Sequence, residues 1–271
     1  MMMYPKKLIG AVFLAAACLL GIAAAAVHDG SASNVTRVTS PGGGISAIEV
    51  PPTSKRLLIA EIFNTQGNQS ERSLLPHRLI ELMDLAKAGH EDIEAWSVDD
   101  AADQHHDLLG TADFDTGSDN PYAPLPPGVA QQFLNQVLGN LGRQAPAPAT
   151  DVPGALRLVA TRAVEARNSG AQKVSAVLIG DGVSTVAGCD FGLAPLDPST
   201  WPATAQLCLG TPPIVLNGVN VLFANAGEDT SGLTDLSVSR AAPQIDEDIV
   251  TQAGGTTGLI DLDVADSGAS Q

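Results

Sequence analysis

The stretch KVSAVLIGDG, residues 173–182, decides the fold of this chain. KVSAVLI is a mostly apolar run of strand length, which is typical of a strand covered on both faces of a sheet. Gly180-Asp181-Gly182 comes directly after it and is a turn signal, so the strand ends there. We therefore expect a central strand with the Asp181 carboxylate just beyond its carboxyl end.

Outside this stretch, strand and helix signals alternate along the chain. Two similar runs predict two further buried strands: LLIAEIF at 57–63 and VNVLFA at 219–224. Apolar side chains at helical spacing predict three helices: 75–86, 129–141 and 152–168. Weaker signals predict a helix at 245–253 and strands at 93–98, 111–116 and 259–264. This alternation predicts an open, doubly wound α/β fold, in which helices cover both faces of a mostly parallel sheet.

Composition restricts the class of protein. The chain has 271 residues, of which 44% are apolar, enough to bury a core. It carries 14 Lys and Arg against 30 Asp and Glu, a formal net charge of -16. Nucleic-acid binding needs clustered cationic side chains to displace counterions, and attraction to anionic lipid needs them too. The charge therefore argues against both partners.

The N-terminus has the pattern of a secretory signal. Lys6 and Lys7 precede an uncharged run, 8–27, which ends in the small residues 23–26. This pattern predicts a signal peptide over residues 1–26, and an uncleaved signal anchor is the alternative. Both alternatives export the rest of the chain. Removal of residues 1–26 takes away two lysines, so the net charge becomes 12 − 30 = -18.

The exported part divides by composition. Residues 27–55 are rich in Gly, Ser, Thr and Pro and predict a flexible leader. Residues 56–265 carry the strand and helix signals of the domain, and 266–271 form a tail. A Pro-rich excursion, 183–218, interrupts the domain directly after the central strand.

The excursion holds the last two cysteines of the chain. Cys189 and Cys208 are an even number of cysteines in a chain that is expected to be exported to an oxidising compartment. This predicts a disulfide bond between them. Trp201 lies between them and has two interpretations. It is either an exposed recognition residue on a constrained loop or an apolar cover over the edge of the core.

Three segments, in this order, resemble the von Willebrand factor A (VWA) domain. ATDVPGAL at 149–156 is similar to the family's Thr-containing loop that opens a helix, and AVLIGDG at 176–182 to its strand ending in Asp-Gly. VNVLFANAG at 219–227, with a later helix and Gly-Gly, resembles the family's last two strands. The resemblance implies a binding or adhesion module whose site lies at the top of the sheet.

The resemblance also implies a divalent cation, usually magnesium, at that site. The family holds it with Asp-x-Ser-x-Ser after the first strand, with the Thr that Thr150 matches and with the Asp that Asp181 matches. This chain has Asn64, Gln66 and Asn68 in place of the Asp and the two Ser residues. An amide in place of the carboxylate removes a full negative charge, so we expect weak or absent metal binding.

Thr150 and Asp181 also have a purely local interpretation. The Asp181 side chain can serve its own turn, and the Thr150 hydroxyl can satisfy a loop backbone group.

Two further clusters contain ligand-type side chains. His105-His106-Asp107, with the acidic stretch 99–103, is interpreted as a solvated loop because adjacent histidines point in different directions. Asp113, Asp115 and Asp119 lack the Gly and the distal Glu of a calcium loop. Neither cluster predicts a metal site.

The sequence favours binding over catalysis. Gly-x-Ser-x-Gly, phosphate loops and dinucleotide fingerprints are missing, and Ser184 lies too late after its strand for a nucleophile elbow. We expect an extracellular or cell-envelope protein as the partner, with no nucleic acid and no membrane contact beyond the N-terminal segment. An exported hydrolase, whose catalytic groups meet only in space, and an anchored structural cell-envelope protein are the alternatives.

Overall fold

In the computed structural model the chain divides into two units, 1–52 and 53–271, and each unit is treated by itself. The described residues are 35–37, 47–49, 55–65, 73–102, 104, 106–114, 127–193, 197–226, 236–260 and 262. The first unit contains an antiparallel pair, β1 (Val35–Arg37) and β2 (Ala47–Glu49). The predicted signal segment and the C-terminal tail lie outside the described residues. No described helix is long and apolar enough to cross a bilayer.

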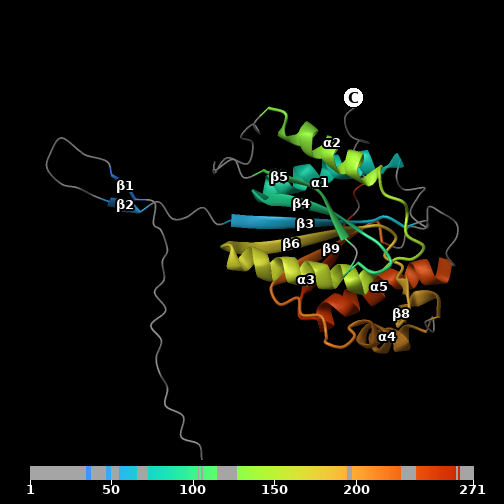
Figure 1. Ribbon diagram of the computed structural model, residues 1–271. Helices are drawn as coiled ribbons and strands as arrows, with labels where there is room; N and C mark the ends of the chain where they lie inside the picture. Colours follow the sequence, from blue (N-terminus) through green and yellow to red (C-terminus); the bar gives the residue numbers. More distant parts are fainter. Residues whose placement is uncertain are drawn as a thin grey trace, which may run out of the picture. The chain divides into compact units, whose positions relative to one another are not determined.

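A six-stranded sheet forms the centre of the second unit (Figure 1). Its strands are β3 (Lys55–Phe63), β4 (Asp92–Val98), β5 (His106–Asp113), β6 (Ala171–Ile179), β9 (Val219–Ala224) and β10 (Thr256–Ile260). The order is β10-β9-β6-β3-β4-β5, and every neighbouring pair is parallel except β4 and β5. Counted along the chain from β3 and read from β5, this order is 3-2-1-4-5-6, a doubly wound arrangement. The predicted fold class is confirmed.

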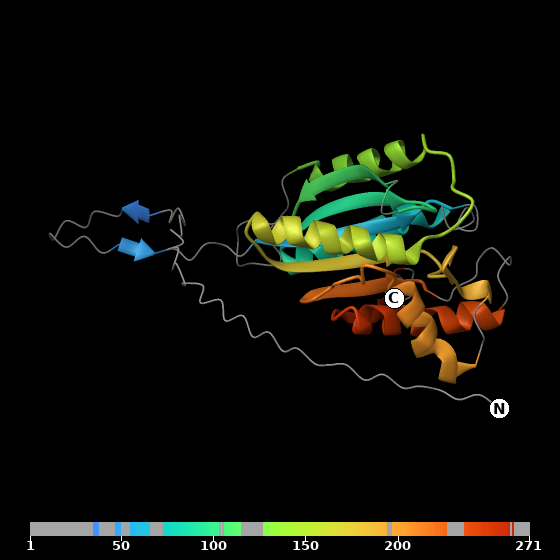
Figure 2. The ribbon, with the colours of Figure 1, turned by 60° about the horizontal axis from the view of Figure 1, so that its bottom comes forward.

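Helices cover the two faces of the sheet (Figures 1 and 2). One face packs against α1 (Leu75–Gly89) and α2 (Val129–Leu141), the other against α3 (Val152–Asn168) and α5 (Leu236–Gln252). Strand β3 supplies both cores because successive side chains alternate. Leu58 and Ile62 are buried toward α1, whereas Ile59 and Phe63 are buried toward α3.

The helix termini follow from local chemistry. Asp151 caps α3, and its Oδ1 accepts a hydrogen bond of 2.8 Å from the Gly154 amide. Helix α1 has Pro76 in its first turn, as predicted. It includes Gly89, however, and the left-handed residue after it is His90, with φ of 51°.

The largest differences between predicted and observed bounds concern three elements. Strand β5 begins at His106 rather than at residue 111, and β10 spans 256–260 rather than 259–264, because both follow the register of a neighbouring strand. Helix α5 begins at Leu236 rather than at 245 and passes through Pro243. Its buried stripe continues before that proline with Val238 and Ala242, so packing outweighs the lost hydrogen bond.

The excursion at 183–218 has structure of its own. It contains a short hairpin, two 3-10 turns and a helix: β7 (Thr185–Val186), β8 (Cys189–Asp190), η2 (Phe191–Leu193), η3 (Pro198–Thr200) and α4 (Trp201–Cys208). The predicted disulfide joins Cys189 to Cys208. Helix α4 packs beside α5, where the Gln252 amide donates to the Pro202 carbonyl at 3.1 Å.

Candidate functional site

The order of the sheet reverses between β3 and β6, its first and fourth strands along the chain. In open α/β sheets, ligands bind outside the carboxyl ends of the strands at such a switch point. Asn64 and Thr65 come after β3, and Gly180-Asp181-Gly182 comes after β6. We call this place the carboxyl edge. Three of the predicted site residues, Asn64, Thr150 and Asp181, lie on its loops.

Thr150 connects the loops of the carboxyl edge. Its hydroxyl donates to Thr65 Oγ1 at 3.2 Å, and its amide donates to Thr185 Oγ1 at 2.9 Å. Its carbonyl accepts from the Thr185 amide at 2.9 Å and from Ser184 Oγ at 3.5 Å. The sequence predicted Thr150 but missed Thr65, whose only signal is its position directly after a buried strand.

Asn64 is turned toward a different loop. Its buried amide group donates to Gln144 Oε1 at 3.3 Å and to the Ala145 carbonyl at 3.4 Å. The same three residues line a hollow of about 430 Å³ beyond the ends of β3 and β4, together with Asp99, His106 and Asp107. The other two residues of the predicted loop, Gln66 and Asn68, lie outside the described residues.

Asp181 serves its own turn and faces a second carboxyl. Its Oδ1 accepts a hydrogen bond of 3.0 Å from the Val183 amide. Asp246 of α5 is fully buried nearby, and neither of its carboxyl oxygens has a hydrogen-bond partner among the described residues. Burial raises the pKa of the Asp246 carboxyl well above its ordinary value, and the Asp181 charge adds to the rise. The surroundings of Asp246 therefore favour the protonated form of its carboxyl.

Gly182, the residue after Asp181, lies close to the Asp246 carboxyl. Its φ is 71°, a left-handed conformation that favours glycine. A Cβ at this position would lie 2.7 Å from Asp246 Oδ2 and 3.1 Å from the Cβ of Ala226. Only a glycine lets α5 approach the turn so closely.

Glu61 is a second buried acid that sequence reasoning missed. It lies within β3, fully buried, and neither of its carboxyl oxygens has a hydrogen-bond partner among the described residues. Burial raises its pKa well above the ordinary value, and the charge of Asp151 adds to the shift. Its signal in the sequence is a single acid inside the apolar run LLIAEIF.

Most side-chain oxygens of the carboxyl edge that could bind a metal ion are neutral. Thr65 and Thr150 supply hydroxyls, Asn64 an amide and Asp181 a carboxylate, all of them already engaged in interactions. Within the described ranges, no group of three or more His, Cys, Asp or Glu side chains is arranged to hold a metal ion. These four side chains are buried, so they hold the loops in place, and a partner could contact only the exposed residues around them, such as Thr185 and Ala187.

Trp201 lies apart from the carboxyl-edge loops, whereas His106 and Asp107 of the predicted cluster line the hollow beside Asn64. Trp201 begins α4, and its ring packs partly buried against the core between α3 and α5. His106 Nδ1 lies 3.0 Å from the Ala102 carbonyl oxygen, and its ring contacts Trp96 edge-on at 5.5 Å. Asp103, His105, Asp115 and Asp119 lie outside the described residues.

Comparisons with known proteins give structural likeness only. No family model and no curated protein sequence matches the chain. The pilus adhesin SpaC from Lactobacillus rhamnosus GG, in its open conformation, is 14% identical with a TM-score of 0.41, over 76% of this chain and 28% of that one. The PilB minor pilin from Streptococcus sanguinis is 13% identical with a TM-score of 0.43, over 80% and 60%. The human COPII-coat protein Sec24c is 13% identical with a TM-score of 0.36, over 77% and 30%. The chain thus spans less than two thirds of each of these proteins, and likenesses of this extent assign it no function.

Proposed function

We propose that this protein is an exported, VWA-like binding module that recognises an extracellular or cell-envelope protein at its carboxyl edge, with weak or absent dependence on a divalent cation. The observation that carries the proposal is the meeting of the Thr65, Thr150 and Ser184 loops at the switch point between β3 and β6. The ordered segments 149–156, 176–182 and 219–227 in the sequence support it.

The chemistry of the edge favours binding by hydrogen bonds over a strong metal site. A divalent cation is held best by charged oxygens, and the Asn64 amide brings no charge and is directed toward Gln144. The Thr150 hydroxyl already donates a hydrogen bond to Thr65 Oγ1. A partner would therefore be recognised mainly by shape and neutral polar contacts around the loops.

Export is supported by the N-terminal pattern and the disulfide. Lys6 and Lys7 before the uncharged run 8–27 favour translocation of the residues after that run. Disulfides form and persist in oxidising compartments, and Cys189 is joined to Cys208. These two features support an extracytoplasmic location. An N-terminus at Val27 in the exported protein would favour cleavage over the retained anchor of a structural protein.

The test is position-specific photocrosslinking in the native host. A photoreactive amino acid replaces Ala187, an exposed residue of the β7–β8 turn near the carboxyl edge, or Asp84, an exposed residue of α1 on the face of the sheet that α3 does not cover. We expect a discrete crosslinked protein from position 187 only, and Thr150→Arg should abolish it. Equal crosslinking from both positions, or none from position 187, would overturn the proposal.

Metal dependence is tested on the same material. We expect 5 mM magnesium to leave the crosslinking yield unchanged and to shift the melting temperature by less than about 1 °C, because the site lacks the charge that holds a hard cation. A shift of several degrees that disappears in Asp181→Ala would contradict weak or absent metal binding. It would not contradict the proposal that a partner binds at the carboxyl edge.

A further inference from the structure

The hollow of about 430 Å³ beside Asn64 has a polar lining, and we call it the Asn64 hollow. It shares Asn64 with the carboxyl edge and lies beyond the ends of β3 and β4. A water molecule takes up about 30 Å³ of the liquid, so the hollow has room for a long side chain. The described residues that line it include Asp99 and Asp107 but no Lys or Arg, so their formal charge is 0 − 2 = -2 with His neutral.

The register of the sheet brings Ser97 and Asp107 to one wall of the hollow. Ser97 of β4 is paired with Asp107 of β5 in the antiparallel register, and both residues line the hollow. Side chains that lie opposite each other on an antiparallel pair share a face, with Cβ atoms about 4.5–5.5 Å apart. A single ligand group can therefore contact both residues.

The hydroxyl of Ser97 is a buried group that requires a partner. Ser97 is only 6% exposed, and its hydroxyl makes no hydrogen bond with any residue that the structure describes. A serine hydroxyl donates one hydrogen bond and accepts two, and buried hydroxyls nearly always have at least one partner. Because Ser97 lines the Asn64 hollow, that partner has to come from a group that enters the hollow.

The two carboxylates of the hollow are each held by one oxygen. Asp107 Oδ2 accepts a hydrogen bond of 2.9 Å from Gln144 Nε2, and Asp99 Oδ1 accepts one of 3.0 Å from the Ala101 amide. In the described part of the chain, neither acid forms an ion pair. The second oxygen of each carboxylate is therefore left to accept hydrogen bonds from a ligand.

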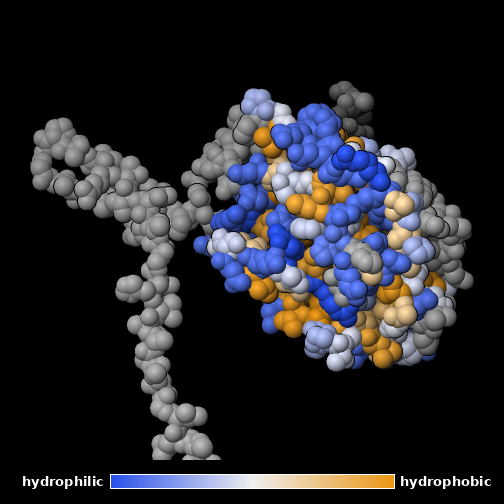
Figure 3. Space-filling model, in the orientation of Figure 1, coloured by the Kyte–Doolittle hydropathy of each residue, from blue (hydrophilic) through white to orange (hydrophobic). Residues whose placement is uncertain are grey.

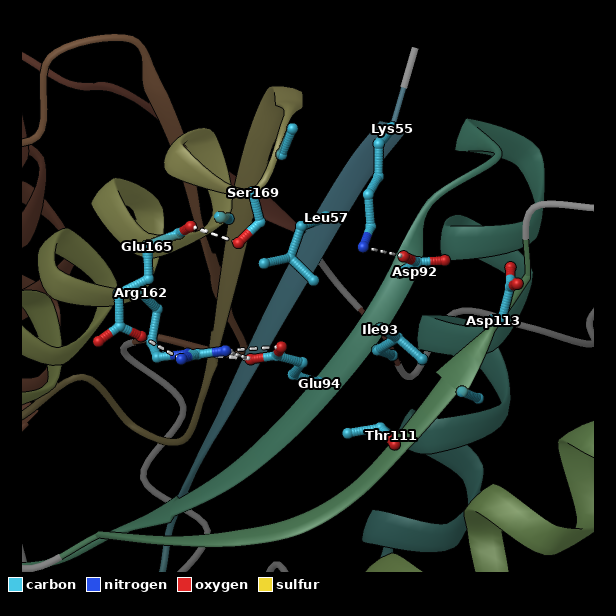
Figure 4. Close-up of a pocket in the computed structure, with 13 residues that line it drawn as sticks. Lys55, Leu57, Asp92, Ile93, Glu94, Thr111, Asp113, Arg162, Glu165 and Ser169 are labelled. Carbon is cyan, nitrogen blue, oxygen red and sulfur yellow. Dashed lines mark hydrogen bonds and ion pairs between the residues drawn. The ribbon is translucent and has the colours of Figure 1, made fainter. Parts of the chain in front are cut away.

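A groove beside α3 differs in this respect, although it also contains acids. It has a volume of about 560 Å³ and lies over β4 and β5, where no described helix covers that side of the sheet (Figure 4). Glu94 and Glu165 both pair with Arg162, and Asp92 Oδ2 lies 3.6 Å from Lys55 Nζ. Cations of the chain itself thus neutralise these acids, whereas the acids of the Asn64 hollow have no such cation.

The surface around the domain favours recognition through a few polar contacts. On the face that Figure 3 displays, apolar patches are interspersed with hydrophilic residues. A partner that binds a mixed surface of this kind gains much of its specificity from polar groups that are placed in pockets.

We infer, on the basis of the proposed function, that the Asn64 hollow binds the guanidinium group of an arginine side chain of the partner protein. A guanidinium carries five N–H donors in one plane and no acceptor, which matches the free oxygens of Asp99, Asp107 and Ser97. It also stacks on aromatic rings, and the half-buried imidazole of His106 lines the same hollow. A lysine ammonium is a compact point charge with three donors and fits these separated acceptors less well.

The first test titrates the purified protein with N-acetylarginine methylamide and follows backbone amide signals by NMR. The citrulline compound, which has the same length but no charge, is the control, and the lysine compound separates an ammonium from a guanidinium. We expect saturable shifts of the Gln104 and Asp107 signals with the arginine compound, which weaken as salt is added. Binding should be at least tenfold weaker with citrulline and at least threefold weaker with lysine.

Matched substitutions assign the binding to the hollow. Asp99→Asn with Asp107→Asn removes its two charges and keeps an oxygen at each position, whereas Asp84→Asn with Glu247→Gln removes two charges from α1 and α5. We expect at least tenfold weaker binding of the arginine compound in the first pair and less than twofold in the second. Ser97→Ala should weaken binding at least threefold and melt like the parent, because the lost hydroxyl has no partner among the described residues.

Photocrosslinking from position 187 separates failure of this inference from failure of the proposed function. Asp99→Asn with Asp107→Asn should lower the yield of the crosslinked partner at least fivefold. An unchanged yield would overturn the inference and leave the proposed function in place. If the arginine compound binds as expected but the parent gives no crosslinked partner, the proposed function alone is overturned.

Four results of the titration would also overturn the inference. They are the absence of a saturable shift with the arginine compound, equal binding of the citrulline or lysine compound, equal weakening in the two pairs of substitutions, and unchanged binding to Ser97→Ala.

Discussion

The carboxyl edge and a groove beside α3, lined by Asp92, Glu94, Asp113 and Glu165, both gather polar side chains, but their groups are satisfied in different ways. At the carboxyl edge, hydroxyls and backbone groups bond one another, and the nearby acids Glu61 and Asp246 are fully buried, which raises the pKa of each carboxyl well above its ordinary value. In the groove, the acids remain within reach of water, and Asp92 and Asp113 are partners across β4 and β5.

This difference has a physical cause that applies to both surfaces. Burial far from water makes a charged carboxyl so costly that the group keeps its proton. A partly exposed carboxyl loses its proton more readily and then attracts a cation. Buried acids thus affect the free energy of unfolding, whereas exposed acids affect the interaction with charged groups in solution. Four substitutions or conditions test this division, from the largest expected effect to the smallest.

The disulfide beside the carboxyl edge should have the largest effect. Replacing Cys189 and Cys208 by Ser opens a loop with a sequence separation of 19, and chain entropy predicts a loss of about 3 kcal/mol in the free energy of unfolding. Urea denaturation measures it. Reduction of the parent protein should reproduce the loss, and a reduced parent as stable as the oxidised one would contradict it.

Gly182→Ala should come second. The substitution places a Cβ at a left-handed backbone position and against Asp246 Oδ2, so we expect a loss of about 1–2 kcal/mol or more. Gly139→Ala in α2 is the matched control, since no atom lies within 4 Å of its added Cβ and the helix gains about 0.5–1 kcal/mol. Denaturation midpoints that move together would speak against a special role of Gly182.

The pH dependence of stability should separate buried from exposed acids. The folded-state pKa of Asp246 is raised, so the folded protein holds a proton that the unfolded chain releases near its ordinary value of 3.8. This contribution to stability is complete below that value, declines as pH rises, and is lost once pH passes the raised pKa. The free energy of unfolding of Asp246→Asn, measured by denaturation, should depend less on pH than that of the parent. Identical pH profiles would rule out the raised pKa of Asp246.

The smallest effect on stability is expected in the groove. Asp113→Asn removes one of two facing charges at an exposed position, so the free energy of unfolding should change by no more than about 0.5 kcal/mol. The pKa of Asp92, raised to about 6 in the parent, should fall toward its usual range, as monitored by a carboxyl NMR titration. An unchanged Asp92 pKa would mean that burial alone causes the shift.

Much of the fold could be predicted because the relevant signals are local. The strands at 57–63, 173–179 and 219–224 are recognisable as apolar runs, and α2 spans the predicted 129–141. The Asp151 cap and the turn after β6 depend on residues within a few positions. Edge elements were predicted less well. Strands β5 and β10 lie at the edges of the sheet, where pairing with a neighbour sets the bounds.

The candidate sites were only partly predictable. Thr150 and Asp181 could be selected because segments around them resemble a family motif. Thr65 could not be selected, because its contact with Thr150 joins residues 85 positions apart. Asp246 lies in a helix segment with no motif, and only the packing of α5 against Gly182 gives it a role.

By itself, the sequence determined the α/β class, the acidic charge and the pairing of the last two cysteines, since these depend on composition, periodicity and counting. Only the tertiary structure decided which loops meet at the switch point, which acids lose their contact with water and which face of the sheet remains uncovered. Local propensity acts over a few residues, whereas the order and register of strands bring Asp92 to Asp113 and Thr65 to Thr150. The electrostatic character of each acid results from that placement.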